Sequence, residues 1–185
     1  RHLPAASRRS PARGACQAAR DLDATIAQQY AYLEELPDGQ LPDSDVFTSE
    51  REAVHDGRTL LAYAEKRITS LAAHPAITGS SFSDSWAVVP TYADLWIVTR
   101  DGRFIVDAVR ERSPAANAGI SVGDTIVASE GTPTRQAVAE FWEALGLSET
   151  PAREEYAARV LVAGRRDRAR KITVQNRSGR VRELV

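Results

Sequence analysis

The sequence predicts an α+β fold in which helices come first and a small β-sheet follows. Three observations point to this class. Residues 103–133 show the pattern strand, one-turn helix, tight turn, strand. Residues 10–74 instead carry apolar residues at the spacing of helices, and residues 170–175 and 180–185 form two further strand-like stretches. Helices segregated from a run of strands are typical of the α+β class.

The central stretch predicts its elements almost residue by residue. Residues 104–109 alternate between a mostly apolar and a mixed face, as a half-buried strand does. Ser113 is expected to cap a very short helix that Pro114 opens, because a hydroxyl can accept a free backbone N–H and proline lacks the donor that the first turn cannot use. Gly119 is expected to end this helix, since glycine adopts the left-handed conformation without steric cost. A turn at 122–124 then leads into a strand over 125–129.

Two longer helices are expected before the sheet. The first is predicted to start near Pro11 and to run to about Leu36, along an apolar stripe formed by Leu22, Ile26, Tyr30 and Leu33. Two prolines and a glycine in residues 37–43 must interrupt it. The capping-box spacing of Ser49 and Glu52 predicts a second helix from about residue 50 to His74.

The remaining elements complete the sheet region. Strands are expected at 86–89 and 94–99, and the Asp-Gly pair at 101–102 predicts a hairpin into the central strand. Helices are expected before Gly146 and from Pro151 to Gly164. The predicted domains are therefore a leader or linker over 1–9, a helical hairpin over 10–76 and a sheet domain over 77–185.

Composition excludes several classes of protein. Of 185 residues, 43% are hydrophobic and 26% charged, which is ordinary for a globular protein, and no apolar run approaches the roughly 18 residues of a transmembrane helix. The single cysteine, Cys16, excludes an internal disulfide and a multi-cysteine zinc site. Because methionine is absent even at position 1, we expect the chain not to be a complete translation product.

Charge is distributed unevenly along the chain. Residues 1–20 carry five arginines and no acid, residues 21–56 carry ten acids, and residues 159–185 carry nine basic groups. Such blocks can attract nucleic acid or anionic lipid. The simpler interpretation is a solvated surface whose arginines pair with the acidic segment. We therefore expect no nucleic-acid partner and no transmembrane segment.

The central stretch resembles the middle of a bacterial PDZ domain. There, an apolar strand leads into Ser-Pro-Ala-x-x-Ala-Gly-Ile, then Gly-Asp, an apolar strand and Gly-x-Pro. The matching residues are Ser113, Pro114, Ala115, Ala118, Gly119, Ile120, Gly123, Asp124, Ile126, Gly131 and Pro133. The resemblance implies a small sheet or partial barrel with helices.

The same resemblance implies a peptide-binding site. PDZ domains add a peptide strand to an open sheet edge beside the long helix, and a preceding loop receives the peptide's carboxylate. By position, the loop is 91–94, the receiving strand 95–98 and the groove wall lies on the long helix. The implied contact residues are Thr91, Tyr92, Ala93, Asp94, Leu95, Trp96, Ile97, Val98, Val138, Phe141 and Trp142.

Two features qualify this site. The loop lacks the usual glycine and contains Asp94, whose carboxylate would repel a peptide carboxylate by about 1 kcal/mol or more at short range. Internal or extended segments are therefore favoured over a free C-terminus. For Phe141 and Trp142 the alternative is a place in the core, because a helix stripe usually faces inward.

More widely, residues 85–185 resemble the tail-specific, or C-terminal-processing, serine peptidases. In that bacterial family a helical region precedes the PDZ domain and the catalytic core follows it. Looser matches are 93–96, 156–168 and 172–174. The resemblance implies an exported, periplasmic location and a parent enzyme of the serine peptidase type.

No catalytic group is expected in this chain itself. The only lysines, Lys66 and Lys171, lie among charged residues where no serine partner is expected. The three histidines, His2, His55 and His74, lack a nucleophile-elbow serine or a partner at metal-ligand spacing, and no glycine-rich phosphate loop is present. Neither a metal nor a cofactor is therefore expected.

The predicted function is non-catalytic binding of a polypeptide, which the fragment would present to a serine–lysine active site elsewhere. The alternative is a scaffold module that makes homo- or hetero-dimer contacts through the helical hairpin. Binding of nucleic acid or lipid through the arginine-rich end is a third hypothesis.

Overall fold

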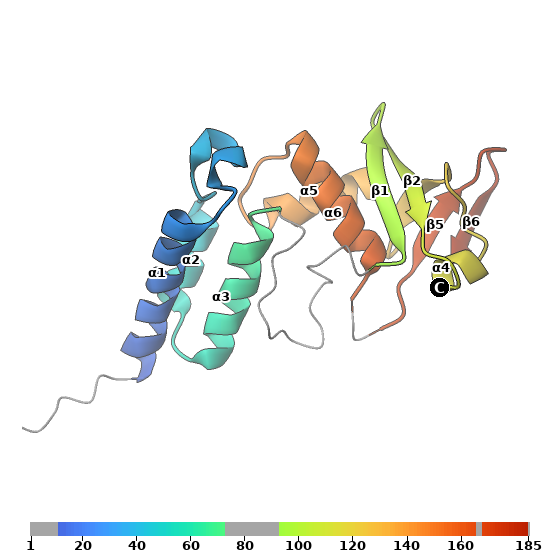
Figure 1. The fold of residues 1–185 in the computed structure, drawn as a ribbon. Coiled ribbons are helices and arrows are strands. Elements are labelled where there is room, and N and C mark those ends of the chain that lie inside the picture. The colour runs from blue at the N-terminus through green and yellow to red at the C-terminus, as the bar shows by residue number, and fades with distance from the viewer. Residues whose placement is uncertain (1–10, 73–92, 166–167, 185) are drawn as a thin grey trace, which may run out of the picture.

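The computed structural model describes residues 11–72, 93–165 and 168–184. Figure 1 shows the N-terminal helices at one end of the molecule and the sheet at the other, with α5 and α6 between them. The predicted α+β class is confirmed, because helices accompany an antiparallel six-stranded sheet. The predicted leader at 1–9 and the predicted strand at 86–89 lie outside the described residues.

Three α-helices and two 3-10 turns form the N-terminal region. They are α1 (Pro11–Gln29), η1 (Leu33–Glu35), η2 (Pro37–Gly39), α2 (Asp45–Ala53) and α3 (Gly57–Thr69). The prediction that the first helix runs to Leu36 was wrong, since α1 ends at Gln29 and the next residues form the 3-10 turns. The described part of this region is helical, with two helices, α2 and α3, where the sequence predicts one.

Local capping explains why α2 and α3 are two separate helices. Ser44, not Ser49, caps α2, and its hydroxyl accepts the N–H of Phe47. Val54 then adopts an extended conformation, which ends α2. The Asp56 carboxylate accepts the N–H of Thr59 at 2.8 Å and the Asp56 N–H donates to the Thr59 hydroxyl, so a capping box starts α3.

A buried polar cluster joins the three helices. The Asp23 carboxylate accepts hydrogen bonds from Arg51 (2.8 Å), Arg67 (2.8 Å) and the Tyr63 hydroxyl (2.6 Å). Burial raises the pKa of Asp23, but the hydrogen bonds from Arg67, Tyr63 and Arg51 outweigh it and leave that pKa below its usual value. Burial and the hydrogen bond to Asp23 raise the pKa of Tyr63 to about 12. The cluster holds α1 against α2 and α3.

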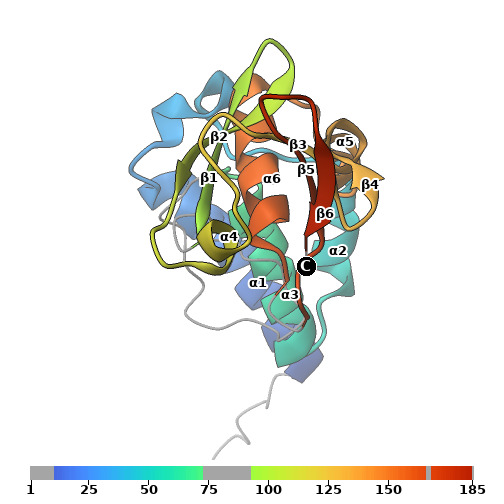
Figure 2. The same ribbon diagram turned by 90° about the vertical axis from the view of Figure 1, so that its right-hand side faces the viewer.

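The sheet is antiparallel, with strand order β1-β2-β3-β5-β6 and β4 paired to β3 (Figure 2). Its strands are β1 (Leu95–Arg100), β2 (Arg103–Val109), β3 (Thr125–Ser129), β4 (Thr132–Pro133), β5 (Ile172–Gln175) and β6 (Val181–Leu184). The helices of this region are α4 (Pro114–Asn117), α5 (Thr134–Glu143) and α6 (Pro151–Ala163).

The central stretch folds as its sequence predicts. The Ser113 hydroxyl accepts the N–H of Ala116 at 3.2 Å and caps α4. Gly119 has φ +75°, the left-handed conformation expected after a helix. Asp101 (φ +51°) and Gly102 (φ +69°) make the tight hairpin between β1 and β2.

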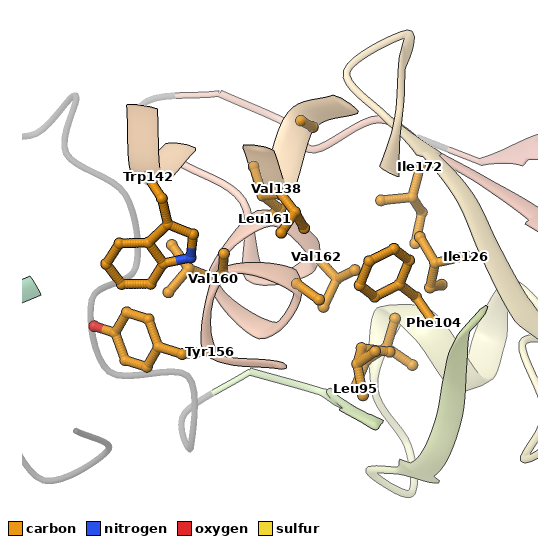
Figure 3. Close-up of a cluster of buried hydrophobic side chains, with 14 of the residues drawn as sticks. Leu95, Phe104, Ile126, Val138, Trp142, Tyr156, Val160, Leu161, Val162 and Ile172 are labelled. Atoms are coloured by element: carbon orange, nitrogen blue, oxygen red, sulfur yellow. The ribbon is translucent and has the colours of Figure 1, made fainter. Parts of the chain in front are cut away.

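Helix α6 lies at the centre of the core. Most of its side chains are buried, and it packs against both β1 and α5. Figure 3 shows α6 side chains together with core residues of the sheet and of α5, the labelled set being Leu95, Phe104, Ile126, Val138, Trp142, Tyr156, Val160, Leu161, Val162 and Ile172. A helix that is buried almost all round cannot face water on either side, so the sheet and α5 enclose it.

The N-terminal helices pack onto this core instead of standing apart. The Ser44 hydroxyl donates to the carbonyl of Leu145 at 2.7 Å, across 101 residues of sequence. Gly146 (φ +65°) permits this approach, since a Cβ there would lie 3.0 Å from the Ser44 side chain. The predicted boundary between residues 76 and 77 lies outside the described residues and stays a prediction. No helix among the described residues is long and apolar enough to cross a membrane.

Candidate functional site

The outer edge of β1, where the sequence predicts strand addition, is covered by α6. Glu155 accepts the backbone N–H of Thr99 at 3.0 Å, and Arg159 donates through Nε to the carbonyl of Ile97 at 2.7 Å. Two of the backbone groups at this edge are therefore already paired with side chains of the same chain. A peptide strand that used them would have to displace Glu155 and Arg159.

Contacts with Trp96, Glu155 and Ile97 stabilise Arg159 in this buried position. Its guanidinium lies 3.8 Å from the centre of the Trp96 ring and 2.7 Å from Glu155, besides its bond to Ile97. Burial lowers the pKa of Arg159, and the Glu155 carboxylate opposes that change. A buried charge is costly unless it is paired and hydrogen-bonded, and these contacts meet that condition.

In the loop before β1, the carboxylate of Asp94 is paired with an arginine. Arg170 donates to both carboxylate oxygens of Asp94, with Nη2 2.7 Å from Oδ2, and Oδ2 also accepts the N–H of Ala115 at 2.9 Å. Burial raises the pKa of Asp94, yet the bonds from Arg170 and Ala115 bring it below its usual value. The repulsion expected from Asp94 is thus offset by Arg170. Of the other loop residues, Ala93 directly precedes Asp94, whereas Thr91 and Tyr92 lie outside the described residues.

The predicted groove-wall residues occupy different environments. Val138 and Trp142 have no exposed surface, and Trp142 donates through Nε1 to the carbonyl of Arg153 at 2.9 Å. These two are core residues in this structure. Phe141 is half-buried and stands edge-on to Trp142, with ring centres 5.1 Å apart. Phe141 lines a cleft, and the peptide-binding role of the whole predicted set stays a prediction.

This cleft, named here the α3–α5 cleft, has a volume of about 500 Å³. Its apolar part is formed mainly by alanine, leucine and phenylalanine side chains, and charged residues surround it. The lining residues are Ala62, Glu65, Lys66, Thr69, Ser129, Glu130, Thr132, Ala137, Glu140, Phe141, Ala144, Leu145, Leu161 and Arg168. Volumes of about 300–1,000 Å³ with apolar walls and a few polar groups are typical of ligand-binding sites.

The charged side chains around the cleft are largely paired. Lys66 contacts Glu50, and Arg168 lies 3.5 Å from Glu130. The net charge at the rim is therefore small, and the cleft exposes mainly apolar surface. An apolar side chain of a ligand would meet Phe141 without displacing a buried ion.

Several titratable side chains among the described residues near these features lie close to a group of opposite charge. Lys171 lies 3.1 Å from Glu183 and Lys66 contacts Glu50, so each of these lysines is paired with a carboxylate. His55 is exposed and lies 3.7 Å from Asp56. Within the part of the chain that the structure describes, no cluster of three metal-ligating side chains occurs.

No protein-family model and no curated protein sequence matches this chain. Solved structures of CPAF, a chlamydial tail-specific protease-like serine protease, do match in fold. A point mutant of CPAF aligns with a TM-score of 0.56, and mature CPAF complexed with lactacystin aligns with 0.55. Mature CPAF without that compound gives 0.51. In each alignment 17% of residues are identical and 94% of this chain is covered.

The chain shares the fold of part of CPAF. It spans about a third of the length of CPAF, namely 33–34% of the matched chains. At this identity the likeness concerns the fold, and the activity of the whole CPAF chain is not carried over by it.

Sequence reasoning missed the side chains on α6 that cover β1. Glu155 and Arg159 have the i,i+4 spacing of an ordinary surface ion pair. One signal was present: residues 156–163 are apolar or alanine except for Arg159, which predicts a helix buried all round. An arginine inside such a helix needs a buried partner, and here that partner is the edge of β1.

Proposed function

We propose that this chain is the non-catalytic, polypeptide-binding part of a serine-protease-related protein. The observation that carries the proposal is the alignment of 94% of the chain with one third of a serine protease, beside a preformed apolar cleft. A protease must hold extended substrate, and a region without catalytic groups can contribute to that task. The PDZ-like pattern of residues 113–133 supports the same class of function.

The α3–α5 cleft is the preferred site for the polypeptide. Its wall includes Phe141, one of the residues predicted to contact a peptide, and it requires no displacement of core side chains. At the β1 edge, by contrast, a ligand strand must first break the bonds from Glu155 to Thr99 and from Arg159 to Ile97. Each hydrogen bond to a charged group contributes about 1.5–3 kcal/mol, so this competition weakens strand addition substantially.

The cleft favours a segment with one or two apolar side chains. These would pack on Phe141, Leu145 and Leu161, while the polar backbone of the ligand stays near Ser129 and Thr132 at the end of β3 and the start of β4. A free C-terminal carboxylate gains little from a rim whose charges are paired. Internal segments and free C-termini should therefore bind about equally.

The scaffold alternative receives less support. The face of the helical region that contains Ser44 and Thr69 already packs against the α5–α6 region of the same chain. A dimer through these helices would have to use their remaining surfaces. A sedimentation measurement that found a tight dimer with the cleft covered would favour the scaffold function.

Titration with fluorescently labelled, extended apolar peptides tests the proposal. Ala144→Arg places a long charged side chain in the cleft at an exposed position, whereas Ala27→Arg makes the same change on the exposed surface of α1. We expect saturable binding that Ala144→Arg weakens at least about tenfold and Ala27→Arg leaves within about twofold. Absence of saturable binding, or equal binding by both variants, would overturn the proposal.

A further inference from the structure

A second pocket, named here the arginine pocket, lies at the opposite end of the sheet from the N-terminal helices. It is formed by the turn between α4 and β3 and by the β5–β6 hairpin, which Figure 2 shows on the side turned to the viewer. Its volume is about 620 Å³ and its lining is mostly polar: Gly119, Ser121, Val122, Asp124, Asn176, Arg177, Ser178, Arg180 and Arg182. It shares no lining residue with the α3–α5 cleft.

Two of the three arginines are anchored on backbone carbonyls. Arg182 donates to the carbonyl of Ala118 at 3.0 Å and also to that of Gly119. Arg177 donates to the carbonyl of Val122 at 3.0 Å. Carbonyl acceptors fix a guanidinium in place without neutralising it, so both groups keep their positive charge.

Glycine makes this anchoring possible. Gly123 has φ +91°, and a Cβ at that position would lie 2.3 Å from Nε of Arg177, which is far too close. Gly119 has φ +75°, and a Cβ there would lie 3.2 Å from Nη1 of Arg182. The turn thus combines a left-handed backbone with close approach of a guanidinium at two separate places.

The charges of the pocket do not balance. Its one acidic group, Asp124, is buried, accepts the N–H of Ser121 at 3.1 Å and lies 3.9 Å from Arg182. The exposed guanidinium of Arg180 has no hydrogen-bond or ion-pair partner among the described residues. Three positive groups therefore face one negative group, and the pocket is left with an excess of about two positive charges.

We propose that the arginine pocket binds carboxylate side chains of an acidic, extended polypeptide segment. Guanidinium groups pair with planar carboxylates through parallel hydrogen bonds. Asp124 disfavours a doubly charged phosphate more than a singly charged carboxylate. In addition, β6 is the last of the described strands in the sheet order and pairs with β5 among them, so its outer edge can accept an extended backbone.

This site goes beyond the proposed function and does not depend on it. The α3–α5 cleft selects apolar side chains, whereas the arginine pocket selects negative charge. Loss of binding in one by substitution should leave the other unchanged. If the apolar peptides do not bind the α3–α5 cleft, the proposal for the arginine pocket is unaffected. If the Glu peptide does not bind the arginine pocket, the proposal for the cleft is unaffected.

The test uses the full chain and a fluorescent peptide of alternating Glu and Thr residues, with a Gln/Thr peptide for comparison. Arg180→Gln and Arg177→Gln each remove one charge from the pocket. Arg100→Gln removes one charge from the exposed β1–β2 hairpin, where Arg100 pairs with Asp107, and is the matched control. Thermal unfolding of each variant confirms that it is folded.

At low salt we expect the Glu peptide to bind and the Gln peptide not to bind. Arg180→Gln and Arg177→Gln should each weaken binding at least about fivefold, with Arg100→Gln within about twofold, and salt should weaken all binding. Absence of binding, or an equal effect of Arg100→Gln, would overturn the proposal. If single-stranded RNA or anionic vesicles bound more tightly than the Glu peptide, with the same dependence on Arg180, an acidic polypeptide would be the wrong class of partner.

Discussion

The Nε atom of Arg159 lies 2.7 Å from the carbonyl oxygen of Ile97, so a side chain of α6 covers the outer edge of β1. The two residues are 62 positions apart in the sequence. An uncovered edge strand presents unpaired backbone groups to which any other strand can bind. Helix α6 therefore protects the sheet, and it also limits what can be added to it.

Replacing Arg159 should destabilise the protein markedly. Arg159→Leu leaves the buried carbonyl of Ile97 without its donor and removes the contact with the Trp96 ring, so the free energy of unfolding should fall by about 2–3 kcal/mol. Arg100→Leu, which breaks an exposed ion pair with Asp107, should cost less than about 1 kcal/mol. Urea unfolding of both variants measures the difference, and equal losses would contradict the role of Arg159.

Thr99 offers a stabilising substitution at the same edge. Its hydroxyl is buried and has no hydrogen-bond partner in the structure. Thr99→Val keeps the shape and the backbone N–H that Glu155 accepts, and it removes the unsatisfied group. We expect the free energy of unfolding to rise by about 1 kcal/mol. A loss of stability in urea unfolding would mean that the hydroxyl has a partner in solution.

Asp94 should contribute to the acid sensitivity of the fold. Its pKa in the folded state is below the ordinary value of 3.8, because the bonds from Arg170 and Ala115 outweigh burial. A lowered folded pKa stabilises the protein above the unfolded pKa, and that stabilisation is lost as the pH falls through the folded pKa. Asp94→Asn should cost about 2 kcal/mol at neutral pH, and this cost should shrink as the pH falls below 3.8 and through the folded pKa.

Thermal unfolding of wild type and Asp94→Asn across this pH range checks the prediction. Asp107→Asn changes an exposed carboxylate that pairs with Arg100 and serves as the control. Its effect should be small at every pH. A destabilisation by Asp94→Asn that did not shrink on acidification would rule out the pair with Arg170 as its cause.

Tyr63 should titrate far above an ordinary tyrosine. Burial and the hydrogen bond to Asp23 raise its pKa to about 12, against the usual 10. Its contribution to stability is complete below pH 10 and is lost as the pH rises through about 12. The ultraviolet difference between wild type and Tyr63→Phe should show tyrosinate forming near pH 12, provided the protein remains folded. If this ultraviolet difference instead showed tyrosinate forming near pH 10, it would exclude the hydrogen bond from Tyr63 to Asp23.

The elements whose ends are set by local chemistry were predictable from the sequence. Ser113 and Gly119 bound α4, and Pro151 and Gly164 mark α6, because caps and left-handed glycines act within one turn of the chain. The second predicted helix failed for the same local reason. Asp56 starts a new helix inside the stretch predicted as one, which the capping-box spacing of Ser49 and Glu52 does not reveal.

The candidate site was less predictable, because long-range packing decides which side chains remain accessible. Phe141 and Trp142 are neighbours on one predicted helix, yet Trp142 turns into the core against Tyr156 and Phe141 lines the cleft. The covering of β1 joins residues 56 and 62 positions apart. The pattern along α6 indicates that Arg159 needs a buried partner, but it does not say which distant residue that partner is.

Hydrogen exchange of the chain with and without a saturating apolar peptide tests the central claim most directly, since it locates the bound ligand on the backbone. Binding in the α3–α5 cleft predicts slower exchange in α3 and α5, with exchange at Thr99 and its neighbours in β1 unchanged. Slower exchange along β1, or faster exchange in α6 as it is displaced, would place the peptide at the β1 edge and contradict the account.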